Sequence, residues 1–418
     1  MADGQGAARV TGRRLAAAAP VVDKFAEMAP TEATVEAASA PRTSLGELAA
    51  LFLRLGATAF GGPAAHVAMI EDEVVVRRRW LTEERFLDLL GATNLIPGPN
   101  STEMAIHVGW ERRRWSGLVV AGACFIAPAM LITGALGHVY ARYGAVPTAR
   151  WLLYGVKPVV LAVIAQALWG LAPKAAKTTS LRVVSVVAAA LSALGVHELA
   201  VLFGCGLAML LRASTADGAK TDDLRPLWPL APSAAGAAAG AVTLPSLFWV
   251  FFKTGSVLFG SGYVLLAFLR ADLVVRLRWL TEAQLVDAIA VGQVTPGPVF
   301  TTATFIGYVL AGPAGAIVAT VGIFLPAFVF VALSGPLVPR LRGSARAGAF
   351  LDGVNAASLA LMAVVSFRLG AAAVVDVPTA LLAAVSALLL LRWKVNTTWL
   401  IAGGALAGWA LHLARGSV

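Results

Sequence analysis

Two segments of this chain, residues 52–99 and 251–298, align without a gap at a constant offset of 199 and are identical at 17 of 48 positions. The shared patterns are Phe60-Gly61, Arg77-x-Arg79-Trp80-Leu81-Thr82-Glu83, Asp88 and Pro97-Gly98-Pro99, which recur as Phe259-Gly260, Arg276-x-Arg278-Trp279-Leu280-Thr281-Glu282, Asp287 and Pro296-Gly297-Pro298. Solenoid repeats are shorter, at roughly 20–50 residues. In an apolar chain, a duplication of this length predicts a transporter built from two related halves.

The composition favours a membrane protein. Hydrophobic residues make up 58% of the chain and charged residues 13%, whereas soluble domains carry about 25% charged residues. Apolar stretches are long enough to cross a bilayer at 116–141, 151–172, 183–211, 245–269, 314–338, 349–367, and 379–391 with 396–414. We therefore expect an all-α, polytopic membrane protein in contact with the lipid bilayer.

Charge and cysteines exclude several other classes. The net charge of +10 comes from short basic clusters between apolar stretches, as in membrane proteins, and no basic surface for nucleic acid is indicated. Cys124 and Cys205 lie inside apolar stretches without ligand-like neighbours, so neither a disulfide framework nor a metal site follows. Enzyme motifs and cofactor-binding motifs are absent from the sequence, so we predict neither catalysis nor a cofactor.

The chain divides into four parts. Residues 1–44 are rich in alanine with interspersed charges and predict a disordered N-terminal tail. Residues 45–211 form the first half, 212–243 read as a linker, and 244–414 form the second half. Basic residues gather at 77–79 and 112–114 in the first half but at 340–346 and 392–394 in the second. Because cytoplasmic loops attract positive charge, the halves are expected to lie in opposite orientations, as an inverted repeat.

The two Pro-Gly-Pro elements predict broken or re-entrant helices. Pro97-Gly98-Pro99 interrupts an apolar stretch, and irregular backbone at membrane depth survives where it is buried in protein or lines a cavity. Asn100-Ser101-Thr102-Glu103 then has the spacing of a helix start with a glutamate at the third position, and such a terminus attracts anions. The second copy, Pro296-Gly297-Pro298, is followed by Thr301. Breaks at equivalent places in two halves indicate a binding site, although kinked helices that only pack are the alternative.

Further candidates lie near these breaks. Arg54 occupies an apolar stretch and Lys253 is its equivalent; cations there are costly and are expected to face the protein interior or an aqueous path. Two such cations suit a dianion, although pairing with helix ends or Glu47 is the alternative. The small residues Gly61, Gly62, Gly260 and Ser261 follow and allow close backbone approach. Glu103 and His107 are spaced as a proton-coupling pair, with helix capping by Glu103 and packing of His107 as the alternative.

The motif strings resemble the chromate ion transporter family in its long form with two fused halves. They are Phe60-Gly61-Gly62-Pro63-x-x-His66, Arg78-Arg79-Trp80-Leu81 and Leu95-Ile96-Pro97-Gly98-Pro99-Asn100-Ser101-Thr102-Glu103, with Phe259-Gly260-Ser261-Gly262-Tyr263 and Thr295-Pro296-Gly297-Pro298 in the second half. The resemblance covers residues 45–414. It implies a bacterial plasma-membrane protein that exports chromate and confers chromate resistance.

An inside-negative potential pushes a dianion outward by about 4.6 kcal/mol per 100 mV, because each charge contributes about 2.3 kcal/mol. We therefore expect electrogenic export by alternating access. A carrier for sulfate or another tetrahedral oxyanion, and an anion channel or non-transporting sensor, stay open as alternatives. The coupling ion, the number of crossings, the side of the tail and the oligomeric state, a homo-oligomer included, also stay open.

Overall fold

The computed structural model describes residues 43–59, 63–93, 95–143, 147–216, 241–258, 265–342, 344–393, 395 and 397–415. Throughout these residues the secondary structure is helical, which confirms the all-α prediction. Residues 1–42 of the predicted N-terminal tail and residues 217–240 of the predicted linker lie outside the described residues.

The same series of helices occurs twice. The first half contains α3 (Leu45–Thr58), α4 (Pro63–Glu71), the π-helical turn η1 (Asp72–Arg77), α5 (Glu83–Thr93), α6 (Asn100–Tyr143), α7 (Pro147–Ala175), α8 (Thr179–Ala193) and α9 (Glu198–Ala216). The second half contains α10 (Leu244–Val257), α11 (Leu265–Leu269), η4 (Arg270–Arg276), α12 (Glu282–Val294), the 3₁₀ turn η5 (Val299–Thr301), α13 (Thr302–Arg342), α14 (Ala345–Ala373), α15 (Val377–Trp393) and α16 (Thr397–Arg415).

Local irregularities of the backbone recur at equivalent positions. A π-helical turn stands at the same place in each half, and the arginine shortly after it, Arg79 or Arg278, has a positive φ of 51° or 54°. The long helices α6 and α13 each fold back at a kink, at Arg113–Arg114 and Ala311–Gly312. Each is therefore a hairpin of two helices joined by a kink, and the duplication extends to backbone geometry.

Among the described residues, four helical stretches are long and apolar enough to cross a membrane: Asn100–Tyr143, Trp151–Pro173, Val299–Ser334 and Ala345–Ala371. Large apolar side chains stand exposed on the outer helices, among them Trp169 at 75% and Phe367 at 86%. Such exposure is expected of a surface that faces lipid rather than water. The chain is thus a multi-pass membrane protein.

Three of the predicted apolar stretches do not form continuous helices. The stretch 183–211 is divided between α8 and α9 by a turn in which Gly195 has a φ of +84°, a conformation that glycine adopts readily. The stretch 245–269 is divided between α10, which ends at Val257, and α11, which begins at Leu265. The stretch 45–69 around Arg54 is likewise divided between α3 and α4. Hydropathy detects apolar residues but not the turns within them.

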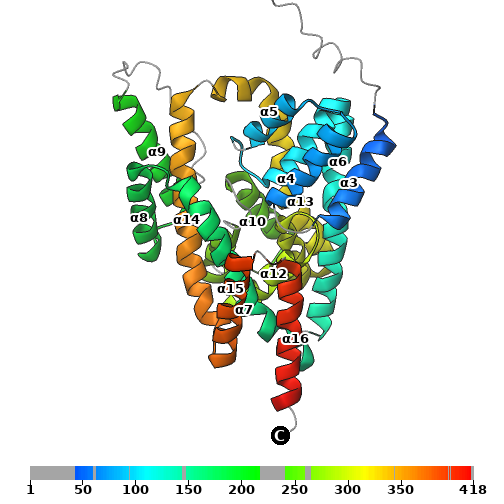
Figure 1. Cartoon of the computed structure of the whole chain (residues 1–418), viewed down its shortest axis with the longest axis vertical. Coiled ribbons are helices and arrows are strands. Elements are labelled where there is room, and N and C mark those ends of the chain that lie inside the picture. Colours follow the sequence, from blue (N-terminus) through cyan, green and yellow to red (C-terminus); the bar gives the residue numbers. More distant parts are fainter. Residues whose placement is uncertain are drawn as a thin grey trace, which may run out of the picture.

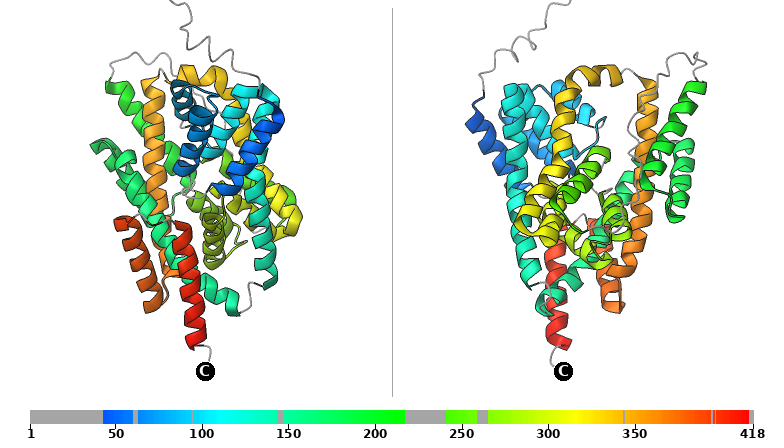
Figure 2. Two further views of the ribbon diagram at one scale, coloured as in Figure 1. Left: turned by 45° about the vertical axis from the view of Figure 1, so that its right-hand side comes forward. Right: turned by 180° about the vertical axis from the view of Figure 1, so that it is seen from behind.

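The helices form two bodies, and each body contains elements of both halves (Figure 1). The motif body consists of α3 to α6 with α10 to α13, and it carries the repeated motifs. The hairpin body consists of α7 to α9 with α14 to α16. Seen from behind, the two bodies again lie side by side (Figure 2). Apolar side chains of α7, α10 and α13 share the largest buried cluster, so the core continues across both bodies.

In the hairpin body the halves exchange partners. The helices α8 and α9 of the first half pack on α14 of the second, and α15 and α16 pack on α7. Glycines bring the backbones together: a Cβ on Gly155 would lie 2.0 Å from the Gly404 carbonyl oxygen, and one on Gly353 would lie 2.9 Å from Gly206 Cα. The equivalent helices α7 and α14 run in opposite directions, as do α9 and α16 (Figure 1).

Candidate substrate site

The two Pro-Gly-Pro breaks contact each other's halves reciprocally. The Gly98 amide donates to the carbonyl of Leu258, at the end of α10, over 2.8 Å. The Gly297 amide donates to the carbonyl of Ala59, at the end of α3, also over 2.8 Å. Each break therefore meets the end of the corresponding helix in the other half, as a local two-fold relation requires.

Glycine is needed at both breaks. Gly98 has a φ of +144° and Gly297 a φ of +85°, both in the region that favours glycine. A Cβ on Gly98 would lie 2.2 Å from Glu103 Oε1 and 3.5 Å from Ala327 Cβ. A Cβ on Gly297 would lie 2.8 Å from the Cβ of Ala129, the residue equivalent to Ala327. The breaks are thus packed between the two halves rather than at the surface.

The start of α6 differs from the predicted capped terminus. Asn100 is the first residue of the helix, and the amides of Thr102 and Glu103 donate to the Pro99 carbonyl over 2.8 and 3.0 Å. The Glu103 carboxylate is fully buried and makes no hydrogen bond among the described residues. The predicted cap by Glu103 is therefore wrong: neither carboxylate oxygen accepts a backbone amide, and Pro99, the residue before the helix, has no N–H to offer.

Unsatisfied polar groups gather on the first two turns of α6. They are Thr102 Oγ1, both oxygens of Glu103 and Nε2 of His107, all buried and without hydrogen-bond partners among the described residues. In the second half, by contrast, the Thr301 hydroxyl donates a hydrogen bond to the Pro298 carbonyl over 2.8 Å. Buried polar groups are normally paired by protein, water or an ion. The first-half break is therefore the better candidate for holding a polar ligand.

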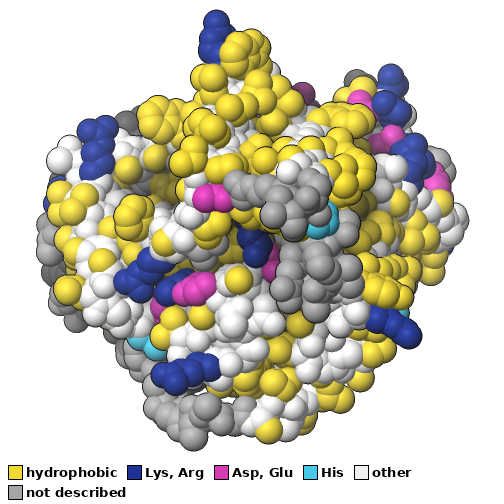
Figure 3. Space-filling model, turned by 90° about the horizontal axis from the view of Figure 1, so that it is seen from below, with side chains coloured by type: hydrophobic (Ala, Val, Ile, Leu, Met, Phe, Trp, Pro, Cys, Tyr) yellow, Lys and Arg dark blue, Asp and Glu magenta, His cyan; other side chains and the backbone are white. Residues whose placement is uncertain are grey.

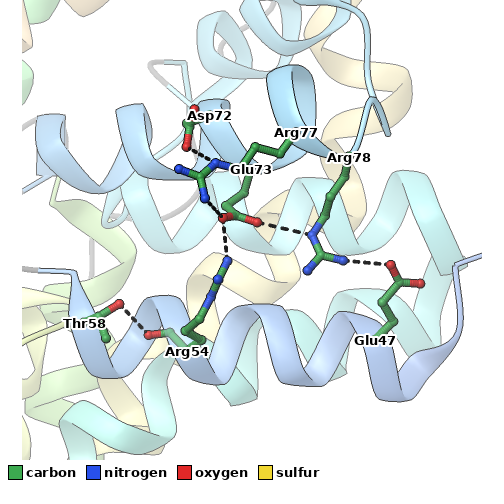
Figure 4. Close-up of polar contacts among 7 residues, drawn as sticks. All are labelled: Glu47, Arg54, Thr58, Asp72, Glu73, Arg77 and Arg78. Atoms are coloured by element: carbon green, nitrogen blue, oxygen red, sulfur yellow. Dashed lines mark hydrogen bonds and ion pairs between the residues drawn. The ribbon is translucent and has the colours of Figure 1, made fainter.

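Arg54 lies in an ion-pair cluster rather than alone in an apolar environment (Figure 4). Its guanidinium lies 2.5 Å from Glu73, and its side chain is 51% exposed. Arg78 bonds Glu73 over 3.3 Å and Glu47 over 2.7 Å, and Arg77 pairs with Asp72 and Glu73. Residues of α3, α4 and η1 around Arg54 and Glu73 line an open hollow of about 450 Å³.

Lys253 has an equivalent partner in the second half. Lys253 pairs with Asp272, and Arg276 reaches the same carboxylate over 2.8 Å. Here the side chains are nearly closed off, at 13% exposed for Lys253 and 6% for Asp272. The triads Arg54–Glu73–Arg77 and Lys253–Asp272–Arg276 occupy aligned positions. Each cation thus faces a carboxylate, Glu73 or Asp272, rather than the helix ends or Glu47 named as the alternative.

Sequence reasoning missed Glu73 and Asp272, although a signal was present. They lie 199 residues apart, the same offset as Arg54 and Lys253, so a carboxylate accompanies a cation in both copies. Glu73 stands in a charged run, residues 71–79, which concealed its pairing with Arg54. The small residues Gly61, Gly62, Gly260 and Ser261 lie outside the described residues.

A buried ion pair joins the two bodies. Lys157 on α7 lies 3.0 Å from Asp287 on α12, and the Tyr140 hydroxyl donates to the same carboxylate over 2.9 Å. Sequence reasoning passed over Lys157 because it is a single cation in a long apolar stretch. On the end face nearest the C-terminus, basic and acidic side chains lie beside one another near the middle, among many apolar ones (Figure 3).

Comparison with known proteins assigns the family. The family model described as "Chromate transporter" matches residues 46–210 and again 245–409. A chromate transport protein of Cupriavidus metallidurans is 33% identical over 376 residues, 88% of this chain and 94% of the relative. One from Pseudomonas aeruginosa is 32% identical over 409 residues, 92% of this chain and 97% of the relative.

A probable chromate transport protein of Synechococcus elongatus is 30% identical over 367 residues, 85% of this chain and 92% of the relative. No solved structure matches the chain. Two family matches lie in tandem and together cover most of the residues, one in each half of the duplication. The chain therefore belongs to the chromate transporter family, a family of transporters rather than enzymes, and has its long, two-half form.

Proposed function

We propose that this protein exports chromate across the bacterial plasma (inner) membrane by alternating access and so confers chromate resistance. Its substrate class is supported by three relatives named for chromate transport, each aligned over at least 85% of this chain. The observation that carries the mechanism is the reciprocal bonding of the two Pro-Gly-Pro breaks, Gly98 to Leu258 and Gly297 to Ala59.

We place the two halves in the membrane as an inverted repeat. Opposite directions of α7 and α14, and of α9 and α16, support this topology (Figure 1). The pairs α5–α6 and α12–α13, each interrupted at a Pro-Gly-Pro element, are then the re-entrant helices. Inverted repeats place a substrate site at their interface, near the middle of the membrane, and the two breaks meet each other's halves there.

The substrate site in this proposal lies at the start of α6. Pro97, Gly98, Pro99, Asn100 and Thr102 form one side of it. Its other side consists of Pro296, Gly297, Pro298 and Thr301. In this proposal Glu103 meets the oxyanion as a neutral acid, because an ionised carboxylate without a partner is very costly in an apolar interior. A protonated Glu103 is a hydrogen-bond donor to an oxyanion, and His107 one turn later completes the proton-coupling pair.

Arg54 and Lys253 belong to the approach to the site. Both are held by carboxylates, so an arriving dianion competes with Glu73 or Asp272 for them. Export is electrogenic and downhill in an inside-negative cell, since a dianion gains about 4.6 kcal/mol per 100 mV.

The test is uptake of radiolabelled chromate into inverted membrane vesicles with an inside-positive potential. Wild-type protein is expected to give saturable uptake. Thr102→Val and Glu103→Gln are expected to reduce it at least tenfold, and Glu103→Gln also to remove the dependence of the residual flux on pH. Arg54→Ala is expected to raise the concentration for half-maximal uptake more than it lowers the maximum rate. Ser116→Ala, at the exposed start of the second helix of α6, is the matched control.

Other outcomes separate the alternatives. Absence of chromate uptake by the wild type would refute the substrate, and sulfate flux in its place would indicate the related oxyanion carrier. Flux that rises linearly with chromate concentration would indicate a channel, and vesicles without flux of either anion would indicate a sensor. Full activity of Thr102→Val and Glu103→Gln would keep a transporter but move the site.

A further inference from the structure

Equivalent faces of α5 and α12 have very different exposure. Leu87 of α5 is 53% exposed, whereas its counterpart Val286 of α12 is 4% exposed. The neighbouring carboxylates show the same difference: the Asp88 side chain is 53% exposed and the Asp287 side chain 7% exposed. Since the two helices share the sequence offset and the same fold, the difference lies in what packs against them.

Contacts between the two bodies come mainly from the second half. From the motif body, α12 packs on α7, α14 and α16, and α11 packs on α14. The equivalent helix α5 packs on α6 and α13, within its own body. The motif body therefore rests on the hairpin body through the α12 side, while α5 has no comparable packing on the described helices of the hairpin body and is exposed at Leu87.

The triads show the same asymmetry. Arg54 is 51% exposed beside its open hollow, whereas Lys253 is 13% exposed. Three aligned positions, on α3 and α5 and their counterparts α10 and α12, thus differ in the same sense. Alternating access in duplicated transporters moves one part of the fold against another around a fixed site, and an asymmetry of this kind is what one end state of such a movement would show.

On the α12 side, Asp287 holds the contact. Its carboxylate forms an ion pair with Lys157 of α7 and accepts a hydrogen bond from the Tyr140 hydroxyl of α6. Internal alignment gives the corresponding pair on the other side. Asp88 is the counterpart of Asp287, and Asn355 of α14 is the counterpart of Lys157, at an offset of 198. An asparagine amide is a hydrogen-bond donor that matches a carboxylate.

We infer that the motif body moves against the hairpin body between two arrangements, that the Lys157–Asp287–Tyr140 contact locks the present one, and that α5 docks on α14 through Asp88 and Asn355 in the other. This inference rests on the proposed transport by alternating access. It gives the exposed face of α5 an occupant within the same chain. The present arrangement is held by an ion pair between Lys157 and Asp287, whereas the other would be held by a hydrogen bond from the neutral Asn355 amide to Asp88. This difference favours the present arrangement.

Disulfide trapping in native membranes tests the inference. In a background of Cys124→Ser and Cys205→Ser, the pair Asp88→Cys with Asn355→Cys reports the other arrangement, and Lys157→Cys with Asp287→Cys reports the present one. Asp88→Cys with Phe367→Cys is the matched control, because Phe367 lies on the same helix but is 86% exposed. A mild thiol oxidant is added, and the bonded forms are separated by non-reducing electrophoresis.

Intramolecular bonding of both test pairs and not of the control is expected. Adding Tyr140→Phe to the Asp88→Cys/Asn355→Cys protein should speed its bonding at least threefold, because the lock is weakened. Oxidation should also stop chromate flux until a reductant is added.

Failure of Asp88→Cys and Asn355→Cys to bond, while the Lys157→Cys and Asp287→Cys pair bonds, would overturn the inference. So would a band of twice the mass, which would make the α5 face an interface between two copies. Bonding is read without transport, so a failure of the chromate proposal appears separately, as absent flux in the reduced protein.

Discussion

Glycine at the first break answers two demands at once. Gly98 adopts a φ of +144°, and its amide donates a hydrogen bond to Leu258 of the other half. The Glu103 carboxylate fills the space that a side chain at position 98 would occupy. An alanine there strains the backbone by about 1–2 kcal/mol and displaces the carboxylate. The residue that shapes the break therefore also determines where the buried acid lies.

We predict that Gly98→Ala lowers the melting temperature of the detergent-purified protein by several degrees and abolishes chromate flux. Gly204→Ala is the control, because nothing lies within 4 Å of a Cβ added at that helical glycine. Thermal unfolding followed by intrinsic fluorescence measures both. Equal stability of the two variants would mean that the break adapts to a side chain.

Glu73 makes the stability depend on pH. Burial alone raises the pKa of Glu73, but hydrogen bonds from Arg54 and Arg78 and the charges of Arg54 and Arg77 outweigh it, so the pKa lies below its ordinary value of 4.5. The ionised form is therefore favoured by folding. Its contribution is fully present above the unfolded pKa and is lost as the pH falls through the folded pKa.

Glu73→Gln should consequently be less stable than the wild type at neutral pH, and the gap should narrow as the pH falls below 4.5. Melting temperatures of both proteins across this range provide the measurement. Asp88→Asn, on an exposed pair with Arg85, serves as the control and should show little change. A gap that widens in acid would show that Glu73 is protonated in the folded protein.

Among elements, the π-helical turns η1 and η4 place equivalent carboxylates against α3 and α10 in different surroundings. Breaking a buried ion pair on one side costs about 3–5 kcal/mol, whereas exposed pairs contribute at most about 1 kcal/mol. Asp272→Asn leaves Lys253 unpaired at 13% exposure, but Glu73→Gln leaves Arg54 at 51% exposure.

We therefore predict that Asp272→Asn destabilises the protein more than Glu73→Gln does at neutral pH. Chemical denaturation in detergent compares the two variants. The double variant Lys253→Met with Asp272→Leu should recover most of the loss, because it removes the buried charges together. If Asp272→Asn and Glu73→Gln lowered the free energy of unfolding equally, and the double variant did not regain stability, the prediction from their different burial would be wrong.

Much of the element order could be predicted from the sequence, because it depends on local signals. The offset of 199 and the Pro-Gly-Pro breaks led to two similar halves and to the interruption between α5 and α6. The turn at Gly195 and the end of α10 were missed, since an apolar average conceals them. The partners of Arg54, Lys253 and Asp287 were missed too, because they come from other helices, and spacing along the chain does not show which helices meet.

The arrangement of the complete protein makes its halves depend on each other. The helices α8 and α9 cover α14, α15 and α16 cover α7, and each Pro-Gly-Pro break bonds to a helix end of the other half. A half on its own leaves these apolar faces and backbone groups without their partners. Unsatisfied backbone groups are especially costly inside a membrane.

Cutting the chain between the halves tests this dependence. Residues 1–228 and 229–418, expressed separately, should each be degraded or aggregated, while co-expression should yield a complex that transports chromate at a rate within a few-fold of the intact protein. Affinity purification through a tag on one piece, followed by size-exclusion chromatography in detergent, measures the assembly.

A cut after residue 195, in the turn between α8 and α9, is the control: it separates α9 from α8 but leaves the exchanged contacts available. A first half that is monomeric and well folded alone would contradict the mutual dependence, because its exposed α7 would then be stable without α15 and α16.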